Sequence, residues 1–407
     1  MKGKKEIRML TKKQLKKYSD VLIWGLKAAR TQSYKKGDIV LVQYDPPAVH
    51  LAECLQESLL KWGMISVLRS GPTTRMEQNF YDKANQKQLT FLGSWEKDLC
   101  QHLNGRIFLH APGSLTHLKH IDPKRIGNVA VAKKPLRDIM RKREEKGELG
   151  WTLCMVPTEA LAEQAKLTLR QYTNQVIKAC YLDKTDPVKE WKQIYRKAIS
   201  LKKWLNQMDI THCHVASDTT DLLIRIGEKR RWSGISGHNI PSFELFLSPD
   251  WRGTKGVYYA DQPSFRSGNY VEGVRLTFER GSVVKINAKK GKNFVEKQLH
   301  MDPGARRLGE FSLTDKRFSK INRFMASTLY DENFGGRYGN CHVAVGMSYT
   351  DTYAGDPAKL TPKVKDKLGF NDSALHWDLV NTENKRVTAH LASGEKVVIY
   401  EDGKFTR

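Results

Sequence analysis

Apolar and polar residues alternate along the first half of the chain in blocks that predict strands and helices in turn. Strands that alternate with helices at this spacing pair in parallel, which predicts an α/β domain with a parallel sheet. Strand-like apolar runs occur at residues 38–44, 64–68, 106–110, 129–132 and 151–156, and helical spacing of apolar residues occurs at 15–26, 51–60, 158–172 and 188–208.

The second half has a different pattern, with short β-rich runs bounded by glycine and few helices, chiefly at residues 315–329. Turn sequences at residues 279–282 and 401–403 predict hairpins, so we expect antiparallel or mixed pairing. The overall prediction is an α/β fold in two parts: an N-terminal α/β domain with a parallel sheet, residues 1–210, and a C-terminal β-rich α+β domain, residues 211–407. The β-rich runs lie at residues 273–278, 283–288, 341–348, 386–391 and 396–400.

Composition narrows the class of protein. With 407 residues, 40% hydrophobic and 28% charged, the chain matches an ordinary soluble globular protein. Its six cysteines are scattered without a CxxC pair, which favours a reducing compartment and disfavours a cysteine-based zinc finger. The apolar stretch at residues 21–29 is too short to span a membrane, and no cleavage site follows it. We therefore expect a cytoplasmic protein with no membrane partner.

The chain is strongly basic, with a formal net charge of +25 at pH 7. Such an excess attracts nucleic acids or anionic lipids. However, no zinc finger, RRM-like aromatic signature or repeated basic helix accompanies the charge. We therefore do not expect a nucleic acid to be the main partner.

Candidate chemistry lies in four segments of the second half, each of which joins turn-forming residues to acids or histidines. Common templates such as GxGxxG, HExxH and GxxxxGK[ST] are absent from the sequence. Three glutamates, one aspartate and two histidines form the ligand inventory of a dinuclear zinc, cobalt or manganese site. Strand alternation places His376 and Asp378 on one face, so they can converge. The six residues are Glu244, Glu310, Glu332, His342, His376 and Asp378.

These segments match a set of ordered motifs. The chain resembles the aminopeptidase T and aminopeptidase S family of metalloaminopeptidases, and the likeness spans most of its length. It departs from the pattern at Ser242 and Phe243, where an acidic residue and glycine are common, and at residues 334–340, which are inserted before the Cys-His pair. The matching stretches are GHNIPSFE at 237–244, GE at 309–310, TLYDEN at 328–333, CHVAVGMSY at 341–349 and NDSALHWD at 371–378.

The resemblance implies that all six candidate residues bind two divalent cations, which activate a water for attack on the first peptide bond. It implies further that Glu310 is catalytic, moving a proton from the water to the leaving amine, and that Tyr349 donates a hydrogen bond to the developing oxyanion. The expected substrates are peptides with a free N-terminus, and the expected assembly is a homodimer.

Two alternatives stay open at this point. One is a basic nucleic-acid-binding protein that keeps the fold without catalysis. The other is a dinuclear metal hydrolase that acts on another amide or on an ester.

Overall fold

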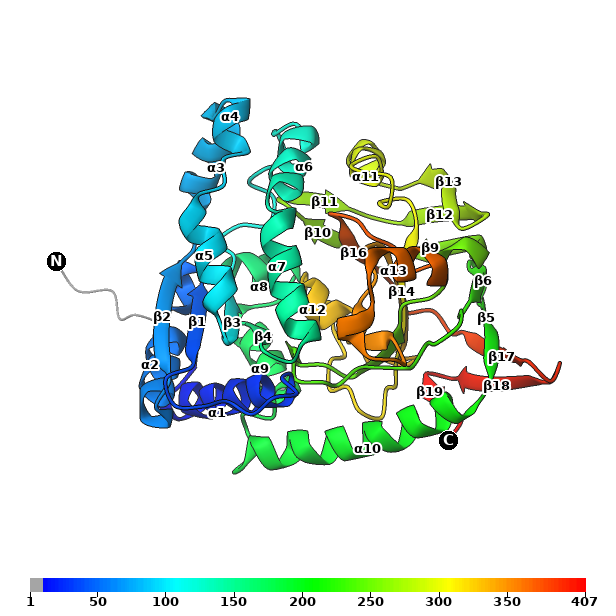
Figure 1. The fold of residues 1–407 in the computed structure, drawn as a ribbon, viewed down its shortest axis with the longest axis horizontal. Helices are drawn as coiled ribbons and strands as arrows, with labels where there is room; N and C mark the ends of the chain where they lie inside the picture. The colour runs from blue at the N-terminus through cyan, green and yellow to red at the C-terminus, as the bar shows by residue number, and fades with distance from the viewer. Residues whose placement is uncertain (1–9) are drawn as a thin grey trace.

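The computed structural model describes residues 10–407, and a five-stranded sheet organises the first half of the chain (Figure 1). The strand order is β2-β1-β3-β4-β7, and all four pairings are parallel. This confirms the predicted α/β architecture with a parallel sheet. In the sequence, β7 comes after β5 and β6, which belong to another sheet. The bounds are β1 Ile39–Tyr44, β2 Ile65–Ser70, β3 Gly105–His110, β4 Gly150–Met155 and β7 Asn239–Ile240.

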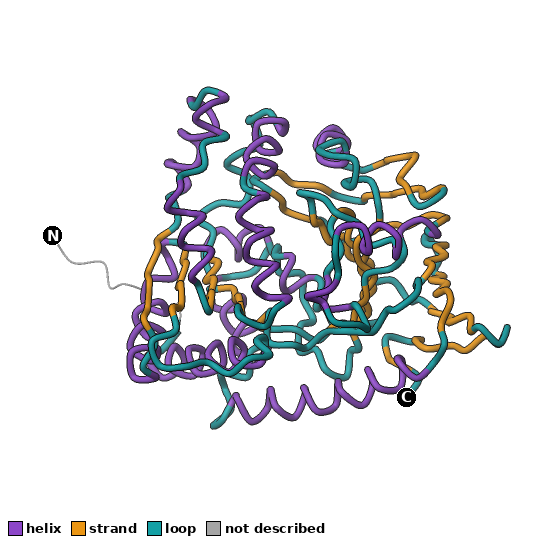
Figure 2. The backbone as a smooth tube through the Cα atoms, viewed as in Figure 1, coloured by secondary structure: helices purple, strands orange, loops and turns teal. Residues whose placement is uncertain are grey.

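Most helices gather around this parallel sheet, as Figure 2 shows. The first helix, α1, begins at a capping box in which Thr11 and Gln14 exchange side-chain and backbone hydrogen bonds. Its residues Tyr18, Leu22 and Leu26 are buried, as their helical spacing predicts. The helices are α1 Lys12–Ala28, α2 Val49–Trp62, α3 Thr74–Lys83, α4 Gln86–Leu89, α5 Ser94–His102, α6 Pro123–Ala132, α7 Lys134–Glu145, α8 Glu159–Gln164, α9 Leu169–Ala179 and α10 Pro187–Gln207, with a 3-10 turn at Pro46–Ala48.

Two local predictions in this half were wrong. The apolar run at 129–132 is the last turn of α6 rather than a strand. Asp122 caps this helix through the amide of Lys124, and Pro123 occupies its first position, so the start signals decide the element. The single helix expected at 158–172 is divided into α8 and α9, because the backbone at Lys166 has a φ of 56°.

The second half forms an eight-stranded and a four-stranded sheet, and every strand pairing in both is antiparallel. The orders are β13-β12-β9-β6-β5-β17-β18-β19 and β16-β15-β14-β8. The strands are β5 Ile210–Ala216, β6 Asp221–Arg225, β8 Glu244–Leu247, β9 Lys255–Ala260, β12 Val274–Glu279, β13 Ser282–Asn287, β14 Leu308–Thr314, β15 Asn340–Gly346, β16 His376–Asn381, β17 Arg386–Leu391, β18 Lys396–Glu401 and β19 Lys404–Phe405, beside a small hairpin of β10 Ser264–Arg266 and β11 Asn269–Val271.

Few helices accompany these sheets, and the long helix predicted at 315–329 is absent from the described structure. Residues 315–327 are irregular because side chains take the backbone amides that a helix would use. Asp331 accepts from the amides of Met325 and Ser327, which lie in the interior of the predicted helix. The helical elements are α11 Lys292–Leu299, α12 Thr328–Asp331 and α13 Pro362–Leu368, with 3-10 turns at Trp251–Gly253, Thr350–Thr352 and Pro357–Lys359.

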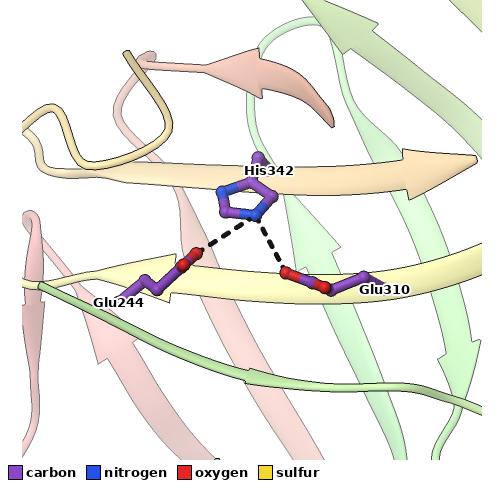
Figure 3. A group of neighbouring side chains, drawn as sticks. All are labelled: Glu244, Glu310 and His342. Atoms are coloured by element: carbon purple, nitrogen blue, oxygen red, sulfur yellow. Dashed lines mark hydrogen bonds and ion pairs between the residues drawn. The ribbon is translucent and has the colours of Figure 1, made fainter. Parts of the chain in front are cut away.

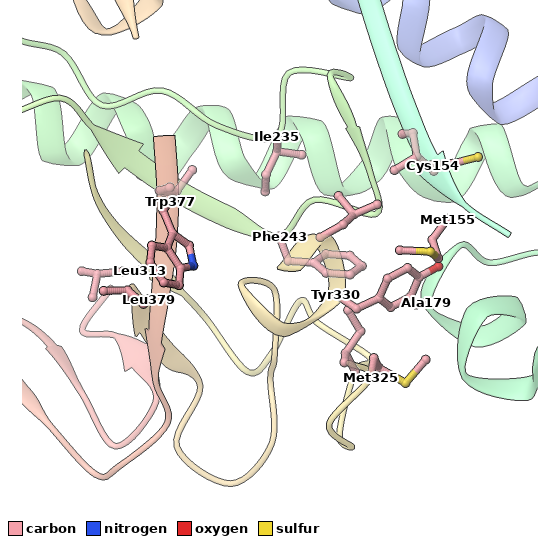
Figure 4. Packing of buried hydrophobic residues seen from close by; sticks show 14 of the residues in the cluster. Cys154, Met155, Ala179, Ile235, Phe243, Leu313, Met325, Tyr330, Trp377 and Leu379 are labelled. Carbon is pink, nitrogen blue, oxygen red and sulfur yellow. The ribbon is translucent and has the colours of Figure 1, made fainter. Parts of the chain in front are cut away.

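The four-stranded sheet lies at the centre of the molecule. Every residue of β14 and β15 is buried. The eight-stranded sheet packs against it, since the Tyr258 hydroxyl of β9 donates to the carbonyls of Cys341 and Leu379 at 3.1 and 2.7 Å. One hydrophobic core runs from the parallel sheet to this sheet, as Figure 4 shows around Phe243 and Tyr330. Within residues 10–407, no helix is long and apolar enough to cross a membrane.

Gly25 of α1 and Gly237 allow a close contact between α1 and the segment that leads into β7. The Gly237 carbonyl accepts a hydrogen bond of 2.8 Å from the Thr152 hydroxyl of β4. A Cβ at Gly237, whose φ is +93°, would lie 2.5 Å from the Gly25 carbonyl oxygen. Gly237 therefore meets two demands, a left-handed backbone and an approach that no side chain permits.

We expect Gly237→Ala to destabilise the protein by about 2–5 kcal/mol, the sum of backbone strain and steric overlap. Gly37→Ala is the matched control, because Gly37 has a φ of +84° but nothing within 4 Å of an added Cβ. It isolates the backbone strain and should cost about 1–2 kcal/mol. Urea denaturation of both variants measures the difference. Equal losses would contradict the close approach of α1 and the β7 segment.

Candidate metal centre

Five of the six predicted ligands come from adjacent strands of the four-stranded sheet and share one face. Glu310 of β14 lies across from Ala344 of β15, which in turn lies across from Asp378 of β16. Glu310, Ala344 and Asp378 thus form a row across three strands. His342 lies two residues from Ala344 and His376 two residues from Asp378, so both histidines point to the same side as the row. Glu244, the first residue of β8, pairs with Thr314, four residues after Glu310. The predicted alternation of His376 and Asp378 onto one face is realised.

The side chains converge closely (Figure 3). His342 Nε2 lies 3.2 Å from Glu244 Oε2 and 3.2 Å from Glu310 Oε1. His376 Nε2 lies 3.3 Å from Asp378 Oδ1 and 3.8 Å from Glu310 Oε2. Glu244, Glu310 and His342 each offer a ligand atom within 4.8 Å of the other two. These five residues therefore form one continuous cluster.

Glu332 approaches the same cluster from outside the sheet, directly after α12. Asn239 Nδ2 donates to its carboxylate at 3.1 Å, and Asn333 Nδ2 lies 3.4 Å away. Burial and then the charges of Glu244, Asp378 and Glu310 raise its pKa well above the usual value. The structure thus brings Glu332 beside the other candidates despite the insertion at 334–340.

The electrostatics of the cluster reflect a surplus of buried carboxylates. Burial, with the charge of Glu310, raises the pKa of Glu244 to about 7, and burial also raises the pKa of Glu310. Although burial alone lowers their pKa values, the neighbouring carboxylates raise those of His342 and His376 to about 9. Asp378 shows the reverse: burial raises its pKa, but the two imidazoles lower it to about 2.

The donor set fits divalent cations. Four carboxylates face two imidazoles in a buried space, so negative charge exceeds what protonated histidines can neutralise. His376 Nδ1 donates to the Met347 carbonyl at 2.8 Å. In the neutral imidazole the lone pair therefore lies on Nε2, which points toward Asp378 and is free to bind a cation. Two groups of acceptors facing each other need a proton or a cation between them. Oxygen and imidazole ligands are those that zinc, cobalt and manganese accept.

The cluster forms part of the wall of a cavity of about 1510 Å³. Five candidate ligands line it, whereas His342 lies behind them and is 1% exposed. Tyr349 also lines the cavity, and its ring lies 4.6 Å from that of His376. Burial and the nearby carboxylates raise the pKa of Tyr349, so its hydroxyl keeps its proton and can donate a hydrogen bond.

Sequence reasoning missed several residues that hold the ligands in place. The Ser312 hydroxyl donates to Glu244 Oε2 at 2.8 Å, and strand alternation from Glu310 is a signal that places it on the same face. Arg266 Nη1 donates to the His376 carbonyl at 2.8 Å. Asn333 accepts from the Phe243 amide through its side-chain oxygen at 2.5 Å. Nothing in the sequence around Arg266 predicts its contact with His376.

The model of one protein family, described as thermophilic metalloprotease (M29), matches residues 11–405. The chain belongs to the M29 metalloprotease family. As a member, it is a hydrolase of peptide bonds that depends on metal. The match confirms the relationship expected from the motifs.

Named relatives agree with the M29 assignment. Aminopeptidase AmpS of Bacillus subtilis is 26% identical over 74% of this chain and 77% of its own length. Aminopeptidase T of Thermus aquaticus is 29% identical over 63% of each chain, and aminopeptidase PepS of Streptococcus thermophilus is 23% identical over 96% and 98%. The solved structure of wild-type AmpT from Thermus thermophilus superposes with a TM-score of 0.79 at 22% identity, covering 97% of this chain and all of that one. This likeness confirms the fold.

Stripping the metal from the protein should lower its melting temperature, and the loss should grow between pH 5.5 and 8.5. Without a cation, ionisation of Glu244 opposes folding from pH ~4.5 upwards, and the effect is complete above about 7. The imidazolium groups stabilise the fold below pH ~6.5, and this contribution is lost as the pH passes about 9. Both effects therefore lower the stability of the metal-free protein as the pH rises.

Calorimetry of metal-loaded and chelator-treated protein at matched pH values measures this gap, with metal content checked by elemental analysis. Ligand deprotonation also strengthens metal binding as the pH rises, so the gap must widen. A gap that stays constant or narrows would show that these residues do not hold the metal.

Proposed function

We propose that this M29 protein is an aminopeptidase that removes the N-terminal residue of peptides with the help of two divalent cations. The observation that carries the proposal is the convergence of four carboxylates and two imidazoles beside a large cavity, which all of them except the buried His342 line. Six ligands exceed the three or four that a single catalytic zinc uses, which favours two cations. The names of the relatives support the choice of an exopeptidase.

In this proposal, Glu244, Glu310, Glu332, His342, His376 and Asp378 hold zinc, cobalt or manganese. The bound cations supply Lewis acidity, which polarises a carbonyl and lowers the pKa of water. The chain holds each ligand through a hydrogen bond or a strand pairing, so little reorganisation accompanies binding. Ser312 fixes Glu244, the Met347 carbonyl orients His376, and Asn239 holds Glu332.

Two residues then act on the substrate. The Glu310 carboxylate lies between both histidines, at 3.2 Å from His342 Nε2 and 3.8 Å from His376 Nε2. We assign it the transfer of a proton from the attacking water to the leaving amine. Tyr349 keeps its phenolic proton at neutral pH and donates it in a hydrogen bond to the oxyanion that develops on the scissile carbonyl.

The remaining parts of the proposal concern organisation. We propose that residues 1–210 form an N-terminal α/β domain, residues 211–407 the catalytic domain, and two copies a homodimer. Exposed apolar side chains support self-association: Met76, Phe91 and Trp95 are 61–63% exposed, and the last two lie in ring contact at 5.9 Å. All six cysteines are free, which supports a cytoplasmic location.

Tyr349→Phe should lower kcat by about 10²-fold and change KM by less than threefold, because the hydroxyl acts in the transition state. The ring remains to pack on His376 and Phe246. Tyr353→Phe is the control, since Tyr353 is buried against Phe370 and does not line the cavity. Steady-state kinetics on leucine p-nitroanilide measures both. A Tyr349→Phe rate within twofold of the wild-type rate would remove Tyr349 from the mechanism.

The test of the proposed function is a comparison of free and N-acetylated pentapeptides of the same sequence. Acetylation turns a basic amine into a neutral amide that is a poor ligand for a cation and a poor partner for the carboxylate-rich wall. We expect single residues to be released in order from the free peptide and at least about 100-fold slower cleavage of the acetylated one. Mass spectrometry over time follows both. Early internal fragments, or equal cleavage of both peptides, would make the protein an endopeptidase.

A further inference from the structure

One face of α7 presents basic side chains to the cavity that contains the metal centre. Lys134, Arg137 and Arg141 recur at intervals of three and four residues, which places them on the same side of the helix, and all three line the cavity. In Figure 1, α7 passes beside α5, and Glu145, its last residue, forms an ion pair of 3.1 Å with Lys365 of α13. The three residues Lys134, Arg137 and Arg141 are called the basic face of α7 below.

Two carboxylates neutralise two of the three cations. Asp138 lies 3.0 Å from Lys134 Nζ and 2.8 Å from Arg141 Nη2. Asp372 lies 3.0 Å from Lys134 Nζ and 3.6 Å from Arg141 Nη1. Three positive charges therefore face two negative charges, and one cation is left over.

Arg137 is that cation. Within residues 10–407, no carboxylate oxygen lies within 4.0 Å of its guanidinium, and its hydrogen bond is from Nη2 to the Ala130 carbonyl at 2.8 Å. Burial lowers its pKa, and the more distant charges of Asp138, Asp302 and Asp372 offset only part of that effect. A guanidinium has five N–H donors, so several remain for a ligand. An anion that enters the cavity would complete this site.

The basic face of α7 lies next to the segment that carries the catalytic groups. Arg141 Nη1 lies 3.6 Å from Met347 Sδ, and the Met347 carbonyl accepts from His376 Nδ1. Met347 therefore lies between Arg141 and His376, one of the proposed metal ligands. Arg141 Nε is buried without a hydrogen-bond partner among the described residues, which leaves a second donor for an anion.

We propose that Arg137, assisted by Arg141, binds a carboxylate of the peptide on the leaving side of the scissile bond. This inference rests on the proposed aminopeptidase function, in which the amino end of the peptide lies at the carboxylate-rich wall. A substrate carboxylate is repelled by that wall and attracted to an unpaired guanidinium, which binds it in a bidentate manner. Two or three residues span at most about 7–11 Å, so the C-terminal carboxylate of a short peptide can serve. An acidic side chain on the second residue offers the same chemistry.

The experiment uses the metal-loaded enzyme and compares kcat/KM for Leu-Gly with that for Leu-Gly-amide, and for Leu-Glu-amide with Leu-Gln-amide. The wild-type enzyme should prefer the carboxylate in at least one pair by about tenfold or more, the size expected for a charged hydrogen bond. The pair that shows the preference identifies the source of the carboxylate. Arg137→Ala should remove it, and Arg137→Lys should restore part of it. Lys142→Ala, an exposed position on the same helix, should leave it unchanged.

Leucine p-nitroanilide carries no carboxylate and separates the two proposals. Its turnover should stay within twofold of wild type in Arg137→Ala. Turnover of the anilide with no preference in either pair would overturn the role of Arg137 alone, and this comparison needs only the wild-type enzyme. A preference that survives in folded Arg137→Ala would also overturn it. No turnover of the anilide or of any peptide would overturn the proposed function, and this inference with it.

Discussion

Mutual repulsion among buried carboxylates is the constraint on which the rest of the structure depends. Four buried acidic side chains lie close together, and their charges raise the cost of ionising one another. Two imidazoles on the same sheet offset part of this charge, and in our proposal divalent cations offset the remainder. On the sheet, the small side chain of Ala344 lies between Glu310 and Asp378. The burial that makes the cluster costly also makes it a strong binder of cations.

The parallel sheet contributes directly to this cluster through a short connection. Three residues separate β7, the last strand of the parallel sheet, from Glu244 at the start of β8. The segment that leads into β7 is held by the contact of Gly237 with α1, and His238 Nε2 lies 3.0 Å from Glu144 of α7. Asn239 of the same strand holds Glu332. The placement of two ligands is thus coupled to the packing of the helical half.

The sequence predicts regular elements well where one signal dominates. The alternating blocks of the first half gave the parallel sheet, and the spacing of Tyr18, Leu22 and Leu26 gave α1 and its buried face. The prediction fails where side chains compete with the backbone: Asp331 binds the amides of Met325 and Ser327, which a helix at 315–329 needs for its own hydrogen bonds. The six candidate ligands were proposed from the resemblance of ordered motifs, and the structure brings these residues together. Arg137 has no such signal, since one arginine in a basic helix looks like any other until its neighbours are known.

The late arrival of β7 has a consequence for how the molecule is made. On the ribosome, β1 to β4 emerge first, followed by β5 and β6 of the other sheet, and only then the strand that covers β4. Until then β4 is an open edge, and such edges invite pairing with foreign chains. Nascent chains released before β7 therefore expose a site for aggregation. For the same reason, a fragment of the chain that ends before β7 leaves the edge of β4 without a partner strand.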